Sequence, residues 1–198
     1  MAKRMIEPKP KQKKIVRLKD AKISKRAIAY MIDWYVGALF TAFPIGLFSL
    51  KLYKTMLHQD IINFPQPIGM IAGLIGLAFA IYYYYIVPAY IWKGQTFGKR
   101  VCHIRIVNED DSEVSKKNLA LRQLLGIFII EGVLVSASSI WQQIIMILTN
   151  INVVQPLMYV GFAISGISVV LVIFKNNHRA IHDYIGKTRV VEGNAEKK

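Results

Sequence analysis

Long apolar segments alternate with polar segments along this chain of 198 residues. Four of the apolar segments have the length of a membrane-spanning helix, which needs about 20 residues. They cover residues 27–50, 68–92, 121–141 and 157–174, and the third could continue to residue 148. The pattern therefore predicts an all-α integral membrane protein with four transmembrane helices.

The polar segments predict small amounts of other structure. Residues 101–107 alternate between apolar and polar side chains, as in a short half-exposed strand, and residues 189–191 are a candidate partner strand. We expect a disordered basic tail over residues 1–23, a membrane domain over 24–191 and a short tail over 192–198.

Composition and charge support a membrane protein and predict its orientation. Apolar residues make up 54% of the sequence and charged residues 19%. The net charge of +14 could indicate nucleic-acid binding, but its distribution argues against that function. Segments 1–26, 93–122 and 175–198 hold eleven, seven and six of the 26 Lys and Arg residues, whereas 51–67 holds two and 142–156 holds none. Because cytoplasmic loops carry the excess of Lys and Arg, we expect both termini in the cytoplasm and the helices in a cell membrane.

The same pattern predicts the partners of the protein. The basic N-terminal tail would attract anionic lipid headgroups, at about 1 kcal/mol per basic residue near the surface, and nucleic acid is not expected. Gly69 and Gly73 in GxxxG spacing, with Ala72, Gly76 and Ala80 on a second row, allow close helix packing in the lipid bilayer. Packing within the chain is favoured there over a homodimer seam. Four helices leave little room for an enclosed path, so we expect a homo-oligomer or a complex with another membrane protein.

Two acidic residues lie inside the apolar segments. Asp33 follows Arg26 by seven residues, which places both side chains on nearly the same helix face, about 10 Å apart along the axis. Glu131 lies nine residues after Arg122, about 13 Å along its own helix, so Asp33 and Glu131 could lie at similar depths. An acid near the centre of a membrane helix costs roughly 2.5–3.5 kcal/mol, and both are candidates for ion transport. An ion pair that fixes helix packing explains Asp33 equally well, and a hydrogen bond within the bundle could explain Glu131.

The polar segments offer weak evidence for a metal or phosphate site. Gly94 and Gly98 bound a turn, but its GxxxGK pattern lacks the spacing and the Ser or Thr of a phosphate-binding loop. His178 and His182 are four residues apart and could bind a metal on one helix face, but they lack a third ligand. The serines of the third apolar segment have no histidine at their depth to activate them. We therefore expect no metal, no cofactor, no catalytic residue and no enzymatic activity.

Four segments of the chain resemble the RDD family of multi-pass membrane proteins: RAIAYMID, GQTFGKRVCHIRIV, LALRQLLG and HRAIHDYIGKTRVV. The resemblance covers most of the chain from residue 24 to residue 191. It implies that Arg26, Asp33 and Asp183 are the arginine and the two aspartates for which the family is named. Glu131 is not one of these three residues.

The resemblance also assigns the glycine-bounded turn and suggests an activity. The residues that match the GxTxGK segment of the family are Gly94, Thr96, Gly98 and Lys99. Membership would imply a mainly bacterial membrane protein, for which transport of a ligand is the usual suggestion and ion exchange has been proposed.

Two functions are consistent with the sequence. The first is transport of an ion or small ligand that uses Asp33, together with Glu131, in the interior of the helix bundle. The second is an accessory or regulatory subunit that binds another membrane protein or membrane enzyme, with Arg26, Asp33 and Asp183 in structural roles. Sodium- or pH-dependent flux through the protein would favour the first function. Stable association with one partner protein would favour the second function.

Overall fold

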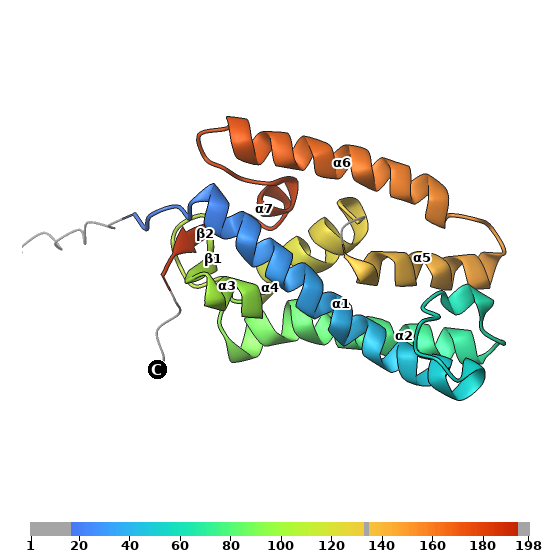
Figure 1. The fold of residues 1–198 in the computed structure, drawn as a ribbon. Coiled ribbons are helices and arrows are strands. Elements are labelled where there is room, and N and C mark those ends of the chain that lie inside the picture. Colours follow the sequence, from blue (N-terminus) through green and yellow to red (C-terminus); the bar gives the residue numbers. More distant parts are fainter. Residues whose placement is uncertain (1–16, 133–134, 194–198) are drawn as a thin grey trace, which may run out of the picture.

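Helices form most of the fold in the computed structural model, which describes residues 17–132 and 135–193 (Figure 1). α1 spans Ile23–Tyr53, and α2 (Ile68–Ile81) continues directly into the π-helical η2 (Tyr82–Ile91). α6 spans Val154–Phe174. Among the described residues, α1, the continuous α2–η2 helix and α6 are the helices long and apolar enough to cross a membrane.

The third predicted membrane helix is interrupted, so the expectation of one continuous helix over 121–141 is wrong. α4 (Lys116–Ala120) continues into the π-helical η3 (Leu121–Ile130), which ends before Glu131. α5 (Ser136–Thr149) begins beyond the interruption and ends close to the limit of the predicted extension. The chain therefore crosses this region as two shorter helices.

The ends of these two helices are joined by side-chain hydrogen bonds. The carbonyl oxygen of Phe128, in the last turn of η3, accepts hydrogen bonds from Ser138 Oγ and Trp141 Nε1, each at 3.0 Å. Ser165 Oγ of α6 donates to the carbonyl oxygen of Glu131 at 2.8 Å. Because a helix end leaves carbonyl groups without helical donors, these bonds stabilise the interruption within an apolar surrounding.

A small antiparallel sheet closes one end of the bundle. β1 (Ile104–Asn108) pairs with β2 (Thr188–Glu192), with Ile106 opposite Val190. The backbone N–H of Ala21, just before α1, donates to the carbonyl oxygen of Val190 at 3.0 Å. Figure 1 shows the start of α1 and the sheet at the same end of the molecule, which we call the sheet end. The described parts of both terminal regions therefore lie on one side, whereas the tail over residues 1–16 is outside the described residues.

Small residues bring α2 close to its neighbours within the chain. The residues of α2 that are buried are Gly69, Ala72, Gly73, Gly76 and Ala80. A side-chain carbon added at Gly76 would lie 2.9 Å from Ile45 of α1, and one added at Gly73 would lie 2.4 Å from Ile61 of η1 (Ile61–Asn63). The small-residue rows therefore serve packing within the chain, as favoured from the sequence.

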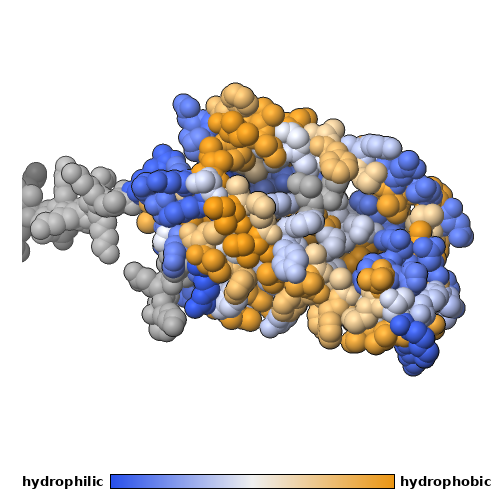
Figure 2. Space-filling model, in the orientation of Figure 1, coloured by the Kyte–Doolittle hydropathy of each residue, from blue (hydrophilic) through white to orange (hydrophobic). Residues whose placement is uncertain are grey.

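Apolar side chains cover much of the outer surface between two hydrophilic ends (Figure 2). Exposed apolar residues follow the whole length of α1 and α6. In α6, the buried residues are Gly161, Ser165 and Ser168. A surface of this kind suits the hydrocarbon layer of a bilayer, so the apolar faces of these helices fit a membrane protein.

Candidate functional site

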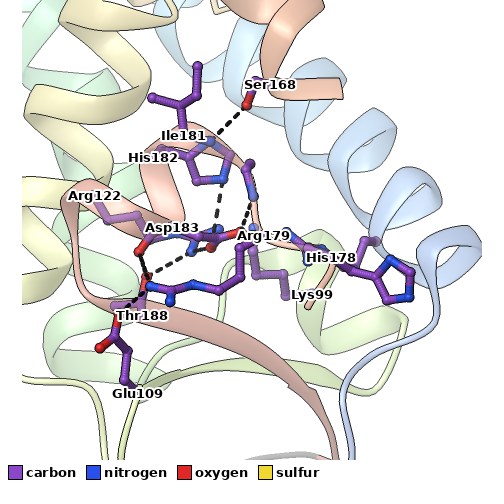
Figure 3. A network of polar contacts seen from close by, with 12 residues as sticks. Lys99, Glu109, Arg122, Ser168, His178, Arg179, Ile181, His182, Asp183 and Thr188 are labelled. Carbon is purple, nitrogen blue, oxygen red and sulfur yellow. Dashed lines mark hydrogen bonds and ion pairs between the residues drawn. The ribbon is translucent and has the colours of Figure 1, made fainter. Parts of the chain in front are cut away.

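Asp183 lies at the centre of an ion-pair network near the sheet end (Figure 3). Its carboxylate is fully buried and belongs to the short helix α7 (Ile181–Ile185). Arg26 Nη2 donates to Oδ2 at 2.6 Å, Arg122 Nη1 donates to Oδ1, and the backbone N–H of Ala180 donates to Oδ2 at 2.9 Å. Arg122 Nη1 also reaches Thr188 Oγ1 of β2 at 3.1 Å. The network therefore joins α1, η3, α7 and β2.

The charge state of Asp183 follows from these contacts. Burial alone would raise the pKa of its carboxyl group, because it disfavours the ionised form. The adjacent Arg122 and Arg26 have the opposite effect and hold the pKa well below its usual value. Asp183 is therefore ionised throughout the physiological range and serves as a fixed counter-ion for two arginines.

Asp33 lies in a second network, with the GxTxGK segment. Its Oδ1 accepts hydrogen bonds from Tyr83 Oη and from the backbone N–H of Gly98, both at 2.8 Å. Its Oδ2 accepts hydrogen bonds from Thr96 Oγ1 and from Lys99 Nζ, the latter at 2.9 Å. Two acceptor oxygens with four donors form a saturated carboxylate, and Lys99 neutralises its charge.

The glycines of this segment allow the close approach. A side-chain carbon at Gly98, in α3 (Phe97–Val101), would lie 2.2 Å from the carbonyl oxygen of Ala29 and 2.9 Å from Asp33 Oδ1. Gly94 has a φ of +83°, and its carbonyl oxygen accepts a hydrogen bond from Ile106 N at 2.9 Å. The segment thus folds over Asp33 and leads directly into the sheet.

Glu131 lies in a third network, at the interruption between η3 and α5. Ser168 Oγ of α6 donates to its Oε1 at 2.7 Å, and the backbone N–H of His182 donates to the same oxygen at 3.0 Å. His182 Nδ1 lies 2.7 Å from Oε2. Glu131 therefore holds α6 and α7 against the end of η3.

α7 links the networks of Glu131 and Asp183. His182 and Asp183 are consecutive, and His182 Nε2 lies 3.9 Å from Asp183 Oδ1. A side-chain carbon at Gly126 of η3 would lie 2.7 Å from His182 Cβ, so α7 packs directly on that helix. Ser168 Oγ also accepts a hydrogen bond from Ile181 N at 3.0 Å, as Figure 3 shows. The networks of Glu131 and Asp183 therefore meet at two consecutive residues of one short helix.

Arg26 and Asp33, which the sequence places on one helix face, have different partners in the structure. Arg26 pairs with Asp183 and donates to the backbone oxygen of His178, whereas Asp33 pairs with Lys99. Arg122 was not among the candidate residues, although it occurs in the LALRQLLG segment, and it is the second arginine that pairs with Asp183.

His178 and His182 do not share a helix face in the structure, and Arg179 between them has partners of its own. His178 precedes α7 and has a φ of +46°, so it does not share a helix face with His182. Its Nδ1 lies 2.8 Å from the carbonyl oxygen of Val172. Arg179 pairs with Glu109, and it contacts the backbone oxygen of Asp183 at 3.0 Å. Within residues 17–132 and 135–193, no group of three or more His, Cys, Asp or Glu could hold a metal ion.

A cavity of about 400 Å³ lies between α1 and α6, beside the networks of Glu131 and Asp183. Its polar lining includes Arg26, Arg122, Glu131 and His182, and the remaining lining is mainly apolar. In Figure 2 the hollow between α6 and α1 shows paler, more hydrophilic residues than the ridges beside it. A volume of this size is in the range of small-molecule sites.

Comparison with known proteins agrees with these features. A model of the RDD family matches residues 21–187, which is most of the chain. The chain belongs to the RDD family. This RDD protein is thus a member of a family of multi-pass membrane proteins, and the resemblance noted from its sequence is confirmed. No curated protein and no solved structure matches it.

In this RDD protein the two aspartates of the family name have separate partners. Asp183 contacts the named arginine, Arg26, directly. Asp33 instead contacts the GxTxGK segment, whose four matching residues lie beside it or in the adjoining turn. Both networks connect the membrane helices with the short elements of the sheet end.

Proposed function

We propose that this RDD protein transports an ion or a small ligand across a cell membrane, with Glu131 as the ionisable group of the path. The observation that carries the proposal is the position of Glu131, which lines the cavity between α1 and α6 at the interruption of a helix. Interrupted helices and acidic residues in the membrane interior are typical of transport sites. The sheet end faces the cytoplasm in this proposal, because the described parts of the segments rich in Lys and Arg lie there.

The contacts favour Glu131 over Asp33 as the group that changes its charge. The four donors around Asp33 include the ammonium group of Lys99, so removal of its charge would leave Lys99 without a counter-ion. Glu131 instead contacts the imidazole of His182, a side chain that carries no permanent charge. Loss of the charge of Glu131 would thus leave no fixed cation unpaired.

Flux in proteoliposomes tests the proposal. Purified protein is reconstituted with a pH-sensitive dye inside, and sodium and pH gradients are imposed. Wild-type protein should change the internal pH, and Glu131→Gln should abolish the change. Gln keeps an acceptor for Ser168 and His182, so the variant should fold. The same substitution at Glu113, an exposed residue outside the cavity, is the control. Wild-type flux in Glu131→Gln would refute the proposal.

An accessory role is the second candidate. It is supported by the internal ion pairs of Asp33 and Asp183, which fit structural roles for Arg26, Asp33 and Asp183. It is also supported by α6, whose exposed apolar faces could contact another membrane protein. Two results together would favour this role. The purified protein would show no flux under any of the gradients, and native mass spectrometry of the protein extracted from its own membrane would show one partner in a fixed ratio.

A further inference from the structure

The cavity between α1 and α6 combines a cationic lining with apolar walls. Among its described lining residues, Arg26, Lys99 and Arg122 carry positive charge, and Glu131 carries negative charge. The aspartates that pair with the three cations, Asp33 and Asp183, approach them from outside this lining. Asp33 pairs with Lys99, whereas Arg26 and Arg122 share the single carboxylate of Asp183. This arginine pair therefore carries one positive charge more than its aspartate, which favours an anionic group beside it.

Arg122 has an unused donor beside this cavity. Its side chain is 3% exposed, and its Nη1 donates to Asp183 and Thr188. Its Nε is buried and has no hydrogen-bond partner among the described residues. A buried donor on a charged group is costly to leave unpaired, and an anionic oxygen is the acceptor that an arginine binds most strongly. Arg122 therefore lines the cavity with a guanidinium group that has one donor unpaired among the described residues.

The walls and the mouth of the cavity are apolar. Val169 and Val172 of α6 and Met31 of α1 line it, and Val169 and Met31 are 52% and 68% exposed. These exposed side chains lie on helices whose outer faces fit the hydrocarbon layer of a bilayer (Figure 2). The mouth therefore opens toward the lipid, and a ligand could enter sideways with an apolar chain in contact with these residues.

We propose that this cavity binds an anionic amphiphile, with its phosphate or carboxylate head at Arg122 and Arg26 and its acyl chain against Val169, Val172 and Met31. The inference rests on the proposed function, since it names the chemical class of the ligand that occupies the same cavity. The anionic head supplies oxygen acceptors for the guanidinium groups of Arg26 and Arg122, and the apolar chain covers the apolar walls and removes them from water.

Binding to the purified full-length protein in detergent micelles tests the inference. The probes are dioctanoyl phosphatidate, dioctanoyl phosphatidylcholine and inorganic phosphate, each titrated by isothermal calorimetry. Phosphatidate should bind about tenfold more tightly than phosphatidylcholine, whose head is zwitterionic. Equal affinities for the two lipids would refute the proposal that the ligand has an anionic head. Inorganic phosphate should bind far more weakly than phosphatidate. Equal affinities for these two probes would refute the proposal that the ligand has an apolar chain and would favour a free anion.

Two neighbouring valines provide matched variants. Val169→Trp fills the mouth of the cavity, whereas Val170→Trp places the same side chain on α6 outside the cavity lining. The two residues are 52% and 51% exposed, so their effects on folding should be similar. Val169→Trp should weaken phosphatidate binding by about tenfold, and Val170→Trp should not. Equal binding by the two variants would overturn the location of the site.

The binding assay and the flux assay can fail separately. Phosphatidate binding that is lost in Val169→Trp, in a protein without flux, would support the ligand class and refute transport. Sodium- or pH-driven flux without selective phosphatidate binding would support transport and refute the anionic amphiphile.

Discussion

Replacement of Asp183 by asparagine should destabilise the protein strongly. The substitution keeps the shape of the side chain and removes one negative charge from a fully buried position. Arg122 and Arg26, whose side chains are 3% and 13% exposed, would then lie close together without their shared counter-ion. Repulsion between the two guanidinium groups adds to the cost of keeping them away from water.

The expected size of the effect follows from this burial. Loss of one partner from a buried ion pair costs about 3–5 kcal/mol. For a chain of this length, 1 kcal/mol changes the melting temperature by roughly 2–4 °C, so Asp183→Asn should lower it by the order of 10 °C. The exposed pair of Lys93 and Glu113 provides the control, because such pairs contribute about 0–1 kcal/mol.

Thermal unfolding in detergent micelles, followed by circular dichroism, measures the difference. Asp183→Asn should melt well below the wild type, and Glu113→Gln should melt close to it. If both variants melted within about 2 °C of the wild type, the ion pairs of Asp183 would not stabilise the fold as argued.

The pH dependence of this difference has a defined sign. Because the folded protein lowers the pKa of Asp183, its ion pairs stabilise the protein fully above the pKa of the unfolded chain, about 3.9. The stabilisation is lost as the pH falls below that value. The gap in melting temperature between wild type and Asp183→Asn should therefore stay constant between about pH 5 and 8 and narrow below about pH 4.

Two further substitutions test the sheet end. Gly98→Ala should destabilise the protein by about 1–3 kcal/mol, because the new carbon would lie 2.2 Å from the carbonyl oxygen of Ala29. Gly166→Ala in α6 should be tolerated, because a carbon added there would lie within 4 Å of no described side chain or neighbouring element. Thermal unfolding compares the two variants. Arg189→Gln should increase tryptic cleavage within residues 17–22, because Arg189 contacts Asp20 and the backbone oxygen of Leu18. Lys187→Gln, at an exposed residue nearby, is the control. Equal digestion of the two variants would contradict this role of Arg189.

The membrane character of the protein could be read from local patterns. A helix that crosses a bilayer needs a long apolar run, and this requirement is visible in the composition of each segment. Three helices among the described residues are long and apolar enough to cross a bilayer, and the RDD resemblance from four short segments is confirmed over residues 21–187. The alternation over residues 101–107 likewise predicted a strand, which begins at Ile104 in the structure and pairs with β2.

The sequence also indicated which residues need partners, because a charge in an apolar segment must be neutralised. It left open whether Arg26 pairs with Asp33 or with Asp183, which lies 157 positions away, and the structure pairs it with Asp183. The seven-residue spacing of Arg26 and Asp33 placed them on one helix face. In the structure α7 contacts Arg26 through Asp183, whereas α3 contacts Asp33 through Gly98. The interruption at Glu131 has a similar origin, because its cost is offset by Ser168 and His182 from distant segments.

Local composition therefore settles which segments enter an apolar environment, because hydrophobic burial depends on each segment's own side chains. The pairing of buried charges depends on which segments the folded chain brings within about 3 Å of one another, and that is decided by the packing of the helices with the sheet end. The cavity between α1 and α6 belongs to this second class, since its cationic lining and apolar walls come from helices far apart in the sequence.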